Sequence, residues 1–279
     1  MDDLTIAPMG AEDLEQVLAW AAAEGWNPGL ADAAAFHASD PKGFYLARIA
    51  GAPVAAISVV NHDPRNAFLG LYLCLPKFRG KGIGYATWQA ALEHAGTRSV
   101  GLDGVPAQEA NYRASGFVKR GSSMRYVGQW EPAAPITVRA MRPSDFETVS
   151  ALDAAAVGYR RPAFLGVWLV STQGLRETLV LERTGRVVGS ATWRACGEGT
   201  KIGPVLAPDL AGALDLIGAI AAKRPGSTLI IDVPEANTAL RAELEAAQFE
   251  VPFVTARMYR GAVPETGVGL QAIATMELG

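Results

Sequence analysis

The 279-residue sequence predicts an α/β fold of the α+β type that is built twice, as two tandem domains. Three observations carry this prediction: an internal repeat that keeps its segments in order, a strand–helix–strand–strand order within each copy, and ample apolar content. Hydrophobic residues make up 49% of the chain, which is enough for two full cores.

The repeat is clearest at the start of each copy, where Thr5–Val17 aligns with Thr137–Val149 without gaps. Tyr45–Ser58 likewise resembles Leu179–Thr192, and each of these segments has a glycine at a hairpin turn. A repeat of this length is too long for a solenoid unit, so it indicates two copies of one domain.

The join between the copies is expected at the sequence QWEPAAP, which begins at Gln129. Its proline and alanine content is typical of an extended linker. We therefore predict a first domain at residues 1–130, a linker at 131–135 and a second domain at 136–279.

Local signals predict the elements of the first copy. The expected elements are, in order, a strand at 5–8, a helix at 11–23, a short helix at 32–38, hairpin strands at 44–49 and 54–61, a strand at 68–75, a helix at 84–95, a strand at 99–102, a helix at 107–114 and closing strands at 117–127. Glu12 and Asp13 lie in the first turn of the first helix, where negative charge is favourable. Gly51 supplies the hairpin turn. Pro76 ends the strand expected at 68–75, because proline cannot extend a hydrogen-bonded ladder.

A short basic loop rich in glycine follows that strand and carries the strongest functional signal in the chain. Residues 79–84 read RGKGIG and precede a helix-like stretch. The glycines allow successive backbone N–H groups to turn towards one point, and the helix N-terminus adds partial positive charge. Arg79 and Lys81 add full positive charges. The loop therefore predicts a site for an anionic ligand that carries phosphate groups.

A nucleoside triphosphate, a dinucleotide and coenzyme A are the alternatives for this ligand. A triphosphate loop ends in Gly-Lys-Ser/Thr, whereas Gly84 is followed by Tyr85 and Ala86. A dinucleotide loop requires G-x-G-x-x-G/A directly after a strand. Gly82 and Gly84 supply its first pair, but Thr87 occupies the third small position and the strand ends several residues earlier. The loop therefore departs from a dinucleotide site at these two points, although Asp103 lies at roughly the right distance for the acidic residue of such a site.

Coenzyme A is the ligand that a family resemblance implies. Residues 79–84 match the Q/R-x-x-G-x-G/A loop of the GCN5-related N-acetyltransferases (GNAT), and residues 112–117, YRASGF, resemble that family's Y-x-x-x-G-F segment. The sequence LDGVPAQEANYRASGF is further similar to a bacterial subgroup of tandem GNAT proteins that includes YitH-like proteins. The resemblance implies two GNAT-like domains, each a mixed, mostly antiparallel sheet flanked by helices. It places the cofactor in a cleft between two splayed strands.

The resemblance implies the site residues of an N-acetyltransferase that uses acetyl-CoA as its co-substrate. The expected cofactor-binding residues are Leu73, Cys74, Leu75, Arg79, Gly80, Lys81, Gly82, Ile83 and Gly84. The strand at 73–75 is expected to supply a backbone N–H group that stabilises the oxyanion. Tyr112 is expected to be the general acid that protonates the leaving thiolate, since pKa values of about 10 and 8.5 allow this transfer. The alternative for Tyr112 is a ring that packs in the core.

The sequence points less clearly to the general base, the group that would take a proton from the amine. The strand at 68–75 has no carboxylate, although many GNAT enzymes carry a glutamate there. Asp103 is a candidate, but Asp232 takes the equivalent place in the second copy, which indicates a structural role for both, such as a helix or turn cap. A water chain is therefore the expected base. The family's common asparagine is replaced by Val105, and Gln108 is a candidate for its pantetheine contact.

Trp26 and Asn27 are the expected acceptor-binding residues. They lie in the link between the first two helices, which often lines the acceptor site in GNAT proteins. A turn with a tryptophan beside asparagine, proline and glycine offers a rigid aromatic face. A tryptophan that anchors this loop to the core is the alternative.

The second copy is expected to lack a cofactor site. Its equivalent passage, residues 201–217, has no basic glycine loop and carries Asp209, which would repel a phosphate. Leu244 takes the position of Tyr112, and Gln248 takes the position of Gly116. A degenerate second domain is therefore predicted.

Composition excludes several classes of partner. The formal net charge of −3 implies no general affinity for nucleic acid or anionic membranes. The sequence begins MDDLTIAPMG, without the features of a signal peptide, and it has no apolar run long enough to span a bilayer. Cys74 and Cys196 fit a reducing cytoplasm, and three scattered histidines have no metal-ligand spacing. A cytoplasmic protein without a metal site is expected, with its oligomeric state open.

The expected function is therefore transfer of an acetyl group from acetyl-CoA to an amine of a small molecule or a protein. Two alternatives remain open: a non-catalytic acyl-CoA-binding module or sensor, and a nicotinamide-dependent oxidoreductase. Tyr112 favours the enzyme over the sensor, whereas Thr87 and the spacing of the loop disfavour the oxidoreductase. The sequence does not identify the amine.

Overall fold

The computed structural model describes residues 3–279, and its elements occur twice in nearly the same order. The first half contains β1 (Leu4–Pro8), α1 (Ala11–Ala23), α2 (Asp32–Ser39), β2 (Phe44–Ile49), β3 (Ala52–Asn61), β4 (Asn66–Cys74), the 3₁₀ helix η1 (Pro76–Phe78), α3 (Ile83–Ala95), β5 (Ser99–Gly104), η2 (Pro106–Gln108), α4 (Glu109–Ala114) and β6 (Val118–Gly128). The second half contains β7 (Val138–Ala140), η3 (Pro143–Asp145), α5 (Phe146–Val157), α6 (Pro162–Trp168), β8 (Arg176–Arg183), β9 (Arg186–Ala195), β10 (Thr200–Leu206), α7 (Leu210–Lys223), β11 (Leu229–Pro234), α8 (Thr238–Ala246), β12 (Glu250–Arg260) and β13 (Leu270–Ala272). This repetition confirms the predicted tandem α/β fold.

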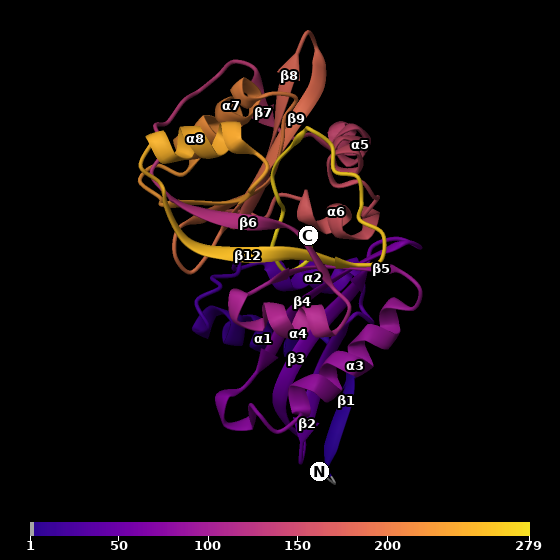
Figure 1. Ribbon diagram of the computed structural model, residues 1–279. Helices are drawn as coiled ribbons and strands as arrows, with labels where there is room; N and C mark the ends of the chain where they lie inside the picture. The colour runs from indigo at the N-terminus through magenta and orange to yellow at the C-terminus, as the bar shows by residue number, and fades with distance from the viewer. Residues whose placement is uncertain (1–2) are drawn as a thin grey trace.

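The strands of both halves form one continuous 13-stranded sheet (Figure 1). Its order is β1-β2-β3-β4-β5-β12-β6-β11-β10-β9-β8-β7, and β13 pairs with β10 outside this path. The β4–β5 and β10–β11 pairs are parallel, whereas the other pairs are antiparallel. The sheet is therefore mixed and mostly antiparallel, as expected.

The two halves exchange their long closing strands at the centre of this sheet. β6 from the first half pairs with β11 of the second half, and β12 from the second half pairs with β5 of the first. β6 and β12 also pair with each other. The sequence predicted closing strands at 117–127 within the first copy, and this was wrong in two respects: a single strand forms there, and it crosses into the other half. Each half therefore needs the other for a complete sheet.

The two parallel strand pairs separate after a short stretch of pairing. β4 and β5 pair only between 66–69 and 99–102, so Gly70 and the residues of β4 after it have no strand partner on that edge among residues 3–279. β10 and β11 separate in the same way after Ile202. Beyond that point β13 pairs with β10 at Val205, so the C-terminal segment fills the gap of the second half.

A shared hydrophobic core joins the halves on one face of the sheet. Helices α2 and α6 pack there, and the rings of Phe36 and Trp168 stack with their centroids 6.3 Å apart. The guanidinium groups of Arg176 and Arg194 lie 4.4 and 4.7 Å from the Trp168 ring, and both pair with the buried carboxylate of Asp32. The contact between the halves is therefore protein interior rather than a loose domain interface.

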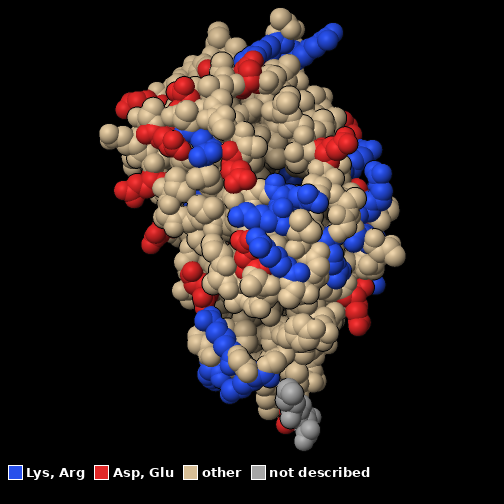
Figure 2. All heavy atoms as spheres, viewed as in Figure 1, with Lys and Arg blue, Asp and Glu red and all other residues tan. Residues whose placement is uncertain are grey.

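Charges of both signs share the surface seen in Figure 2. Basic side chains gather across the middle of this face, with acidic side chains on both sides of them. This mixture agrees with the small formal net charge of −3. Within residues 3–279, no helix is long and apolar enough to cross a membrane.

Candidate active site

The gap between β4 and β5 opens into a cleft with two adjoining parts. The outer part is a groove of about 510 Å³ beside the glycine loop, and the inner part is a pocket of about 70 Å³. Trp26, Tyr72, Val105 and Gln108 line both parts. Because they share these walls, a ligand in the groove lies next to a ligand in the pocket.

The glycine loop forms one wall of the groove at the N-terminus of α3. Gly80 and Gly82 have φ angles of +74° and +78°, a conformation that side chains other than glycine rarely adopt. A Cβ atom at either position would meet no atom within 4 Å, so backbone conformation rather than crowding requires glycine. Among the described residues, no side chain caps the first turn of α3, which leaves its amide groups available to an anion. This geometry suits the phosphate groups of an anionic ligand.

Arg79 lies at the rim of the groove in an ion pair. Its Nε donates to the backbone carbonyl of Cys74 at 2.8 Å, and its Nη2 lies 2.5 Å from Glu24 Oε1. The side chains of Arg79 and Glu24 are 51% and 39% exposed, so this ion pair is weak. The guanidinium is therefore free to turn towards a phosphate without a large energetic cost.

Most of the predicted cofactor residues meet at the groove. Those that line it are Leu73, Cys74, Arg79, Gly80, Gly82 and Gly84. Lys81 lies instead over the ring of Phe78, 5.5 Å from its centroid, and the Ile83 side chain is buried in the core. Leu75 donates its N–H to the carbonyl of Val54 at 3.0 Å, so this amide is not free to bind an oxyanion. The Leu75 amide therefore does not have the oxyanion role expected for the strand at 73–75, whereas the contact expected of Ile83 would be made by its backbone N–H at the start of α3 and stays a prediction.

β4 changes direction where it leaves β5. Leu71 has a φ angle of +48°, and the register with β3 shifts next to it. In the part of the chain that the structure describes, no strand pairs with the edge of β4 that faces β5 from Gly70 to Cys74. Backbone N–H groups on such an edge are available as donors to a developing oxyanion.

Tyr112 projects from α4 into the wall of the inner pocket. Its ring stacks on Trp88 with centroids 5.5 Å apart, and a Cβ atom on Gly104 would lie 2.3 Å from it. Burial raises the pKa of Tyr112, and the nearby Tyr72 raises it further, so the phenol is protonated at neutral pH. The protonated hydroxyl is the form that a general acid requires.

Tyr72 is a site residue that the sequence analysis missed. It lines both parts of the cleft from β4, and its ring meets Trp88 edge-on at 5.3 Å. A Cβ atom on Gly84 would lie 2.8 Å from the Tyr72 hydroxyl, so this glycine leaves room for the tyrosine as well as for a ligand. A polar ring in an apolar strand just before the glycine loop was the available signal.

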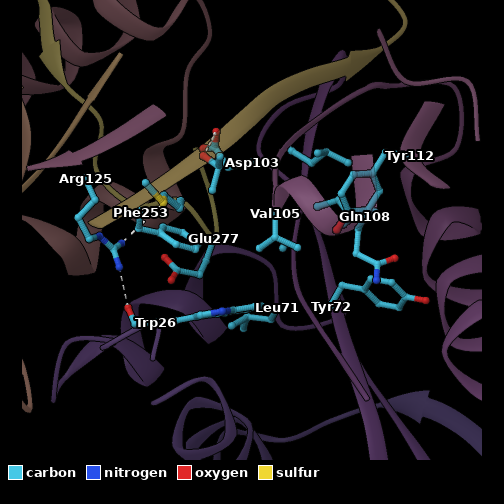
Figure 3. A pocket seen from close by; sticks show the side chains of 15 residues that line it. Trp26, Leu71, Tyr72, Asp103, Val105, Gln108, Tyr112, Arg125, Phe253 and Glu277 are labelled. Carbon is cyan, nitrogen blue, oxygen red and sulfur yellow. Dashed lines mark hydrogen bonds between the residues drawn. The ribbon is translucent and has the colours of Figure 1, made fainter. Parts of the chain in front are cut away.

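Both halves of the chain build the inner pocket (Figure 3). Its walls from the first half include Trp26, Leu71, Asp103, Tyr112 and Arg125. Phe253 comes from β12, and Met276 and Glu277 come from the C-terminal segment. Sequence reasoning missed the residues of the second half, because no local pattern connects positions more than 100 residues apart.

The two predicted acceptor residues have different surroundings. Trp26 lines both parts of the cleft, and its carbonyl accepts hydrogen bonds from Arg125 and Lys201 at 3.1 and 2.9 Å. Asn27 instead bridges to the second half, where its amide exchanges hydrogen bonds of 2.8 and 3.2 Å with the backbone of Glu198. Contrary to expectation, the Asn27 side chain therefore joins the halves rather than facing the cleft.

The N-terminus of α7, which corresponds to that of α3, is closed to anions. Asp209 accepts a hydrogen bond from the Gly212 N–H at 2.8 Å, and it pairs with Arg183 at 2.5 and 2.9 Å. Its carboxylate takes the place that a phosphate would need. The adjacent gap between the strands is filled by β13.

Comparison with known proteins agrees with this geometry. A model of the acetyltransferase (GNAT) family matches residues 11–121, and a model of an acetyltransferase (GNAT) domain matches residues 149–267. The holothin acyltransferase of Pseudoalteromonas sp. (strain SANK 73390) is 37% identical over 279 residues, which cover 99% of this chain and 94% of that protein. The chain belongs to the GNAT family of acyltransferases.

Solved structures share the tandem fold of this GNAT protein. A putative acetyltransferase from Pyrococcus horikoshii has a TM-score of 0.82 and 21% identity, covering 100% of this chain and 97% of that one. A GCN5-related N-acetyltransferase from Sphaerobacter thermophilus has a TM-score of 0.62 and 18% identity, covering 95% and 98%. A tandem GNAT protein from the clavulanic acid biosynthesis pathway has a TM-score of 0.61 and 17% identity, covering 92% and 97%. At these identities the likeness concerns the fold alone.

Proposed function

We propose that this GNAT protein transfers an acetyl group from acetyl-CoA to an amine held in the inner pocket. The observation that carries the proposal is the shared wall of groove and pocket at Trp26, Tyr72, Val105 and Gln108. A thioester that extends from the glycine loop along the groove ends beside that pocket. When bound, the cofactor supplies an activated acyl carbon. The first half then binds the cofactor, and the second half completes the acceptor pocket.

The residues of the cleft have separate roles in this proposal. The loop amides at Gly80–Gly84 hold the phosphates, and Gln108 takes the pantetheine contact. The unpaired edge at Gly70–Cys74 donates to the oxyanion. Tyr112 gives its proton to the leaving thiolate, and the pKa of Tyr112, raised by burial, keeps that proton in place until the carbon–sulfur bond breaks.

The proposed acceptor is a small-molecule amine. A pocket of about 70 Å³ suits a compact group better than a folded protein surface. The relative that is 37% identical is named for acyl transfer to holothin. Holothin is therefore the first acceptor to test with this chain.

The test measures thiol release from acetyl-CoA with purified protein, first with holothin and then with a library of small amines. Acceptor-dependent thiol release and an acetylated product are expected. Acetyl-CoA binding without turnover of any amine would instead indicate the binding module or sensor. A thermal shift with NAD but not with acetyl-CoA would indicate the oxidoreductase.

A further inference from the structure

The C-terminal segment after β12 passes both strand gaps before it reaches the inner pocket. At Gly203 on β10 a Cβ atom would lie 2.2 Å from the carbonyl oxygen of Ile273. At Gly70 on β4 a Cβ atom would lie 2.1 Å from the carbonyl oxygen of Glu277. Gly203 directly follows Ile202, the last residue of β10 that pairs with β11. Gly70 directly follows Leu69, the last residue of β4 that pairs with β5. These two close backbone contacts fix the position of Glu277 in the pocket.

The side chain of Glu277 is buried, and within residues 3–279 it forms no direct ion pair, although the charges of Arg125, Lys201 and Arg194 lie near enough to interact with it. Its residue exposure is 5%. Among residues 3–279, its carboxylate accepts a hydrogen bond from the Thr275 hydroxyl and forms no ion pair with a basic side chain. Arg125 is paired with Asp232, and Lys201 donates to a backbone carbonyl. Because no ion pair satisfies this buried carboxylate directly, a positively charged ligand group in contact with it would gain charge-assisted hydrogen bonds.

The surroundings of this carboxylate suit an amine on an apolar frame. Figure 3 shows Glu277 beside Trp26 and Phe253, with Tyr112 on the other side of the pocket. The aromatic walls exclude water and pack against an apolar body, while the carboxylate accepts charge-assisted hydrogen bonds. The carbonyl of Glu277 itself lies against Gly70, where the unpaired edge of β4 begins. A nitrogen held by Glu277 is therefore close to the candidate oxyanion donors.

We infer that Glu277 binds the ammonium group of the acceptor and is the base that deprotonates it. The inference rests on the proposed acyl transfer, and it names the ligand class: a small primary amine on an aromatic or aliphatic frame. It also gives the second half a part in catalysis, although the cofactor loop lies in the first half.

The protons balance in this scheme. Glu277 takes one proton from the ammonium, and the neutral nitrogen attacks the acyl carbon. A carbon–nitrogen bond forms and the carbon–sulfur bond breaks. Tyr112 protonates the thiolate, and its phenolate then takes up the second proton that the nitrogen loses, so the tyrosine ends the turnover as it began. Glu277 then releases its proton to water, so each turnover releases one proton.

The test compares benzylamine with benzyl alcohol, which has nearly the same shape but no positive charge. Binding of each is measured by calorimetry to wild-type protein, Glu277→Gln and Glu243→Gln in the presence of coenzyme A. Glu243 is an exposed glutamate on α8 and serves as the matched control. The wild type should prefer benzylamine by about 10-fold to 100-fold, the usual contribution of a hydrogen bond to a charged group. Glu277→Gln should lose this preference, and Glu243→Gln should keep it.

Undetectable binding of benzylamine by the wild type, or binding equal to that of benzyl alcohol, would overturn the inference, as would a preference that survives in Glu277→Gln.

The kinetic arm uses an amine that the wild type acetylates. Its kcat should fall about 10²-fold to 10⁴-fold in Glu277→Gln, with the Kd of acetyl-CoA unchanged. An unchanged kcat would remove Glu277 as the base. If the wild type acetylates no amine, the proposed function fails, while the binding arm still decides whether Glu277 holds ammonium groups.

Discussion

Arg257 on β12 places its Nη2 atom 2.6 Å from Oδ2 of Asp103 on β5, and this ion pair ties the second half to the first. The hydroxyls of Ser123 and Thr255 donate to the same carboxylate at 2.9 and 3.1 Å. With these partners, and with a side chain that is 0% exposed, Asp103 is not available as a general base. The carboxylate instead secures an exchanged strand.

The same arrangement recurs on the other side of the strand exchange. Arg125 on β6 lies directly opposite Asp232 on β11, with hydrogen bonds of 2.7 and 2.9 Å. Burial alone would raise the pKa of Asp232, but the Arg125 guanidinium holds it below its usual value. Asp103 and Asp232 therefore have structural roles, but as ion-pair partners that hold β6 and β12 in the opposite halves rather than as the expected helix or turn caps.

Gly82→Val is expected to weaken acetyl-CoA binding by about tenfold or more. Valine is strained at a φ angle of +78°, and the loop amides must move to relieve that strain. Calorimetry should give one site per wild-type chain. Gly51→Val is the control, since Gly51 has a φ angle of +79° and open space in a distant hairpin turn. Two sites per chain, or an equal effect of both substitutions, would contradict the assignment of the loop.

Tyr112→Phe should lower kcat by about 10²-fold to 10⁴-fold, the usual contribution of acid–base catalysis. The acetyl-CoA Kd should barely change, because the proton is delivered mainly in the transition state. Tyr126→Phe is a matched control: Tyr126 is a buried tyrosine that donates to Glu245 outside the cleft. If kcat falls in Tyr72→Phe and not in Tyr112→Phe, the proton comes from the neighbouring tyrosine.

Trp26→Ala should raise the KM of the acceptor more than the KM of acetyl-CoA, because the indole forms a wall of the inner pocket. Steady-state kinetics with each substrate varied in turn measures both values. Trp130→Ala is the matched control, because Trp130 packs on Phe249 of the second half, with the ring centroids 6.1 Å apart. A lower melting temperature in Trp26→Ala without a change in acceptor KM would leave Trp26 as a packing residue.

Gly70→Ala should displace the C-terminal segment and lower the free energy of unfolding by about 1–3 kcal/mol, since the added methyl group would overlap the Glu277 backbone. Urea denaturation measures the stability, and limited proteolysis after Arg260 reports release of the segment. Gly166→Ala on α6 is the control, because its added methyl group would meet no described atom within 4 Å. Wild-type stability and protease resistance in Gly70→Ala would show that the segment is not held at this strand.

His62 should make the fold less stable in mild acid. Burial, and then Arg161, lower the pKa of His62 to about 4, whereas the unfolded value is about 6.5. Between these values the unfolded chain binds more protons, so stability is complete above about pH 6.5 and falls as the pH drops towards 4. A loss of roughly 3 kcal/mol by pH 4 is expected by chemical denaturation. His62→Gln should flatten this dependence, and His37→Gln should not. An equal slope in wild type and His62→Gln would assign the acid sensitivity to other groups.

The sequence by itself determined the features that depend on neighbouring residues. The glycine loop was predictable because positive φ angles at Gly80 and Gly82 and the start of α3 follow from a local pattern. The repeat, the mixed order of elements and the blocked N-terminus of α7 at Asp209 were visible for the same reason. Such signals act within a few residues, so they can be read along the chain.

Only the tertiary structure decided which half completes which site. β6 and β12 carry strand patterns that fit either half, and the choice depends on pairs such as Arg257 with Asp103, 154 positions apart. The position of Glu277 depends on close backbone contact at Gly70, and a glycine inside a strand indicates such contact without naming the partner. The inner pocket therefore could not be predicted locally, because its walls meet only after both strands have crossed and the shared core has packed.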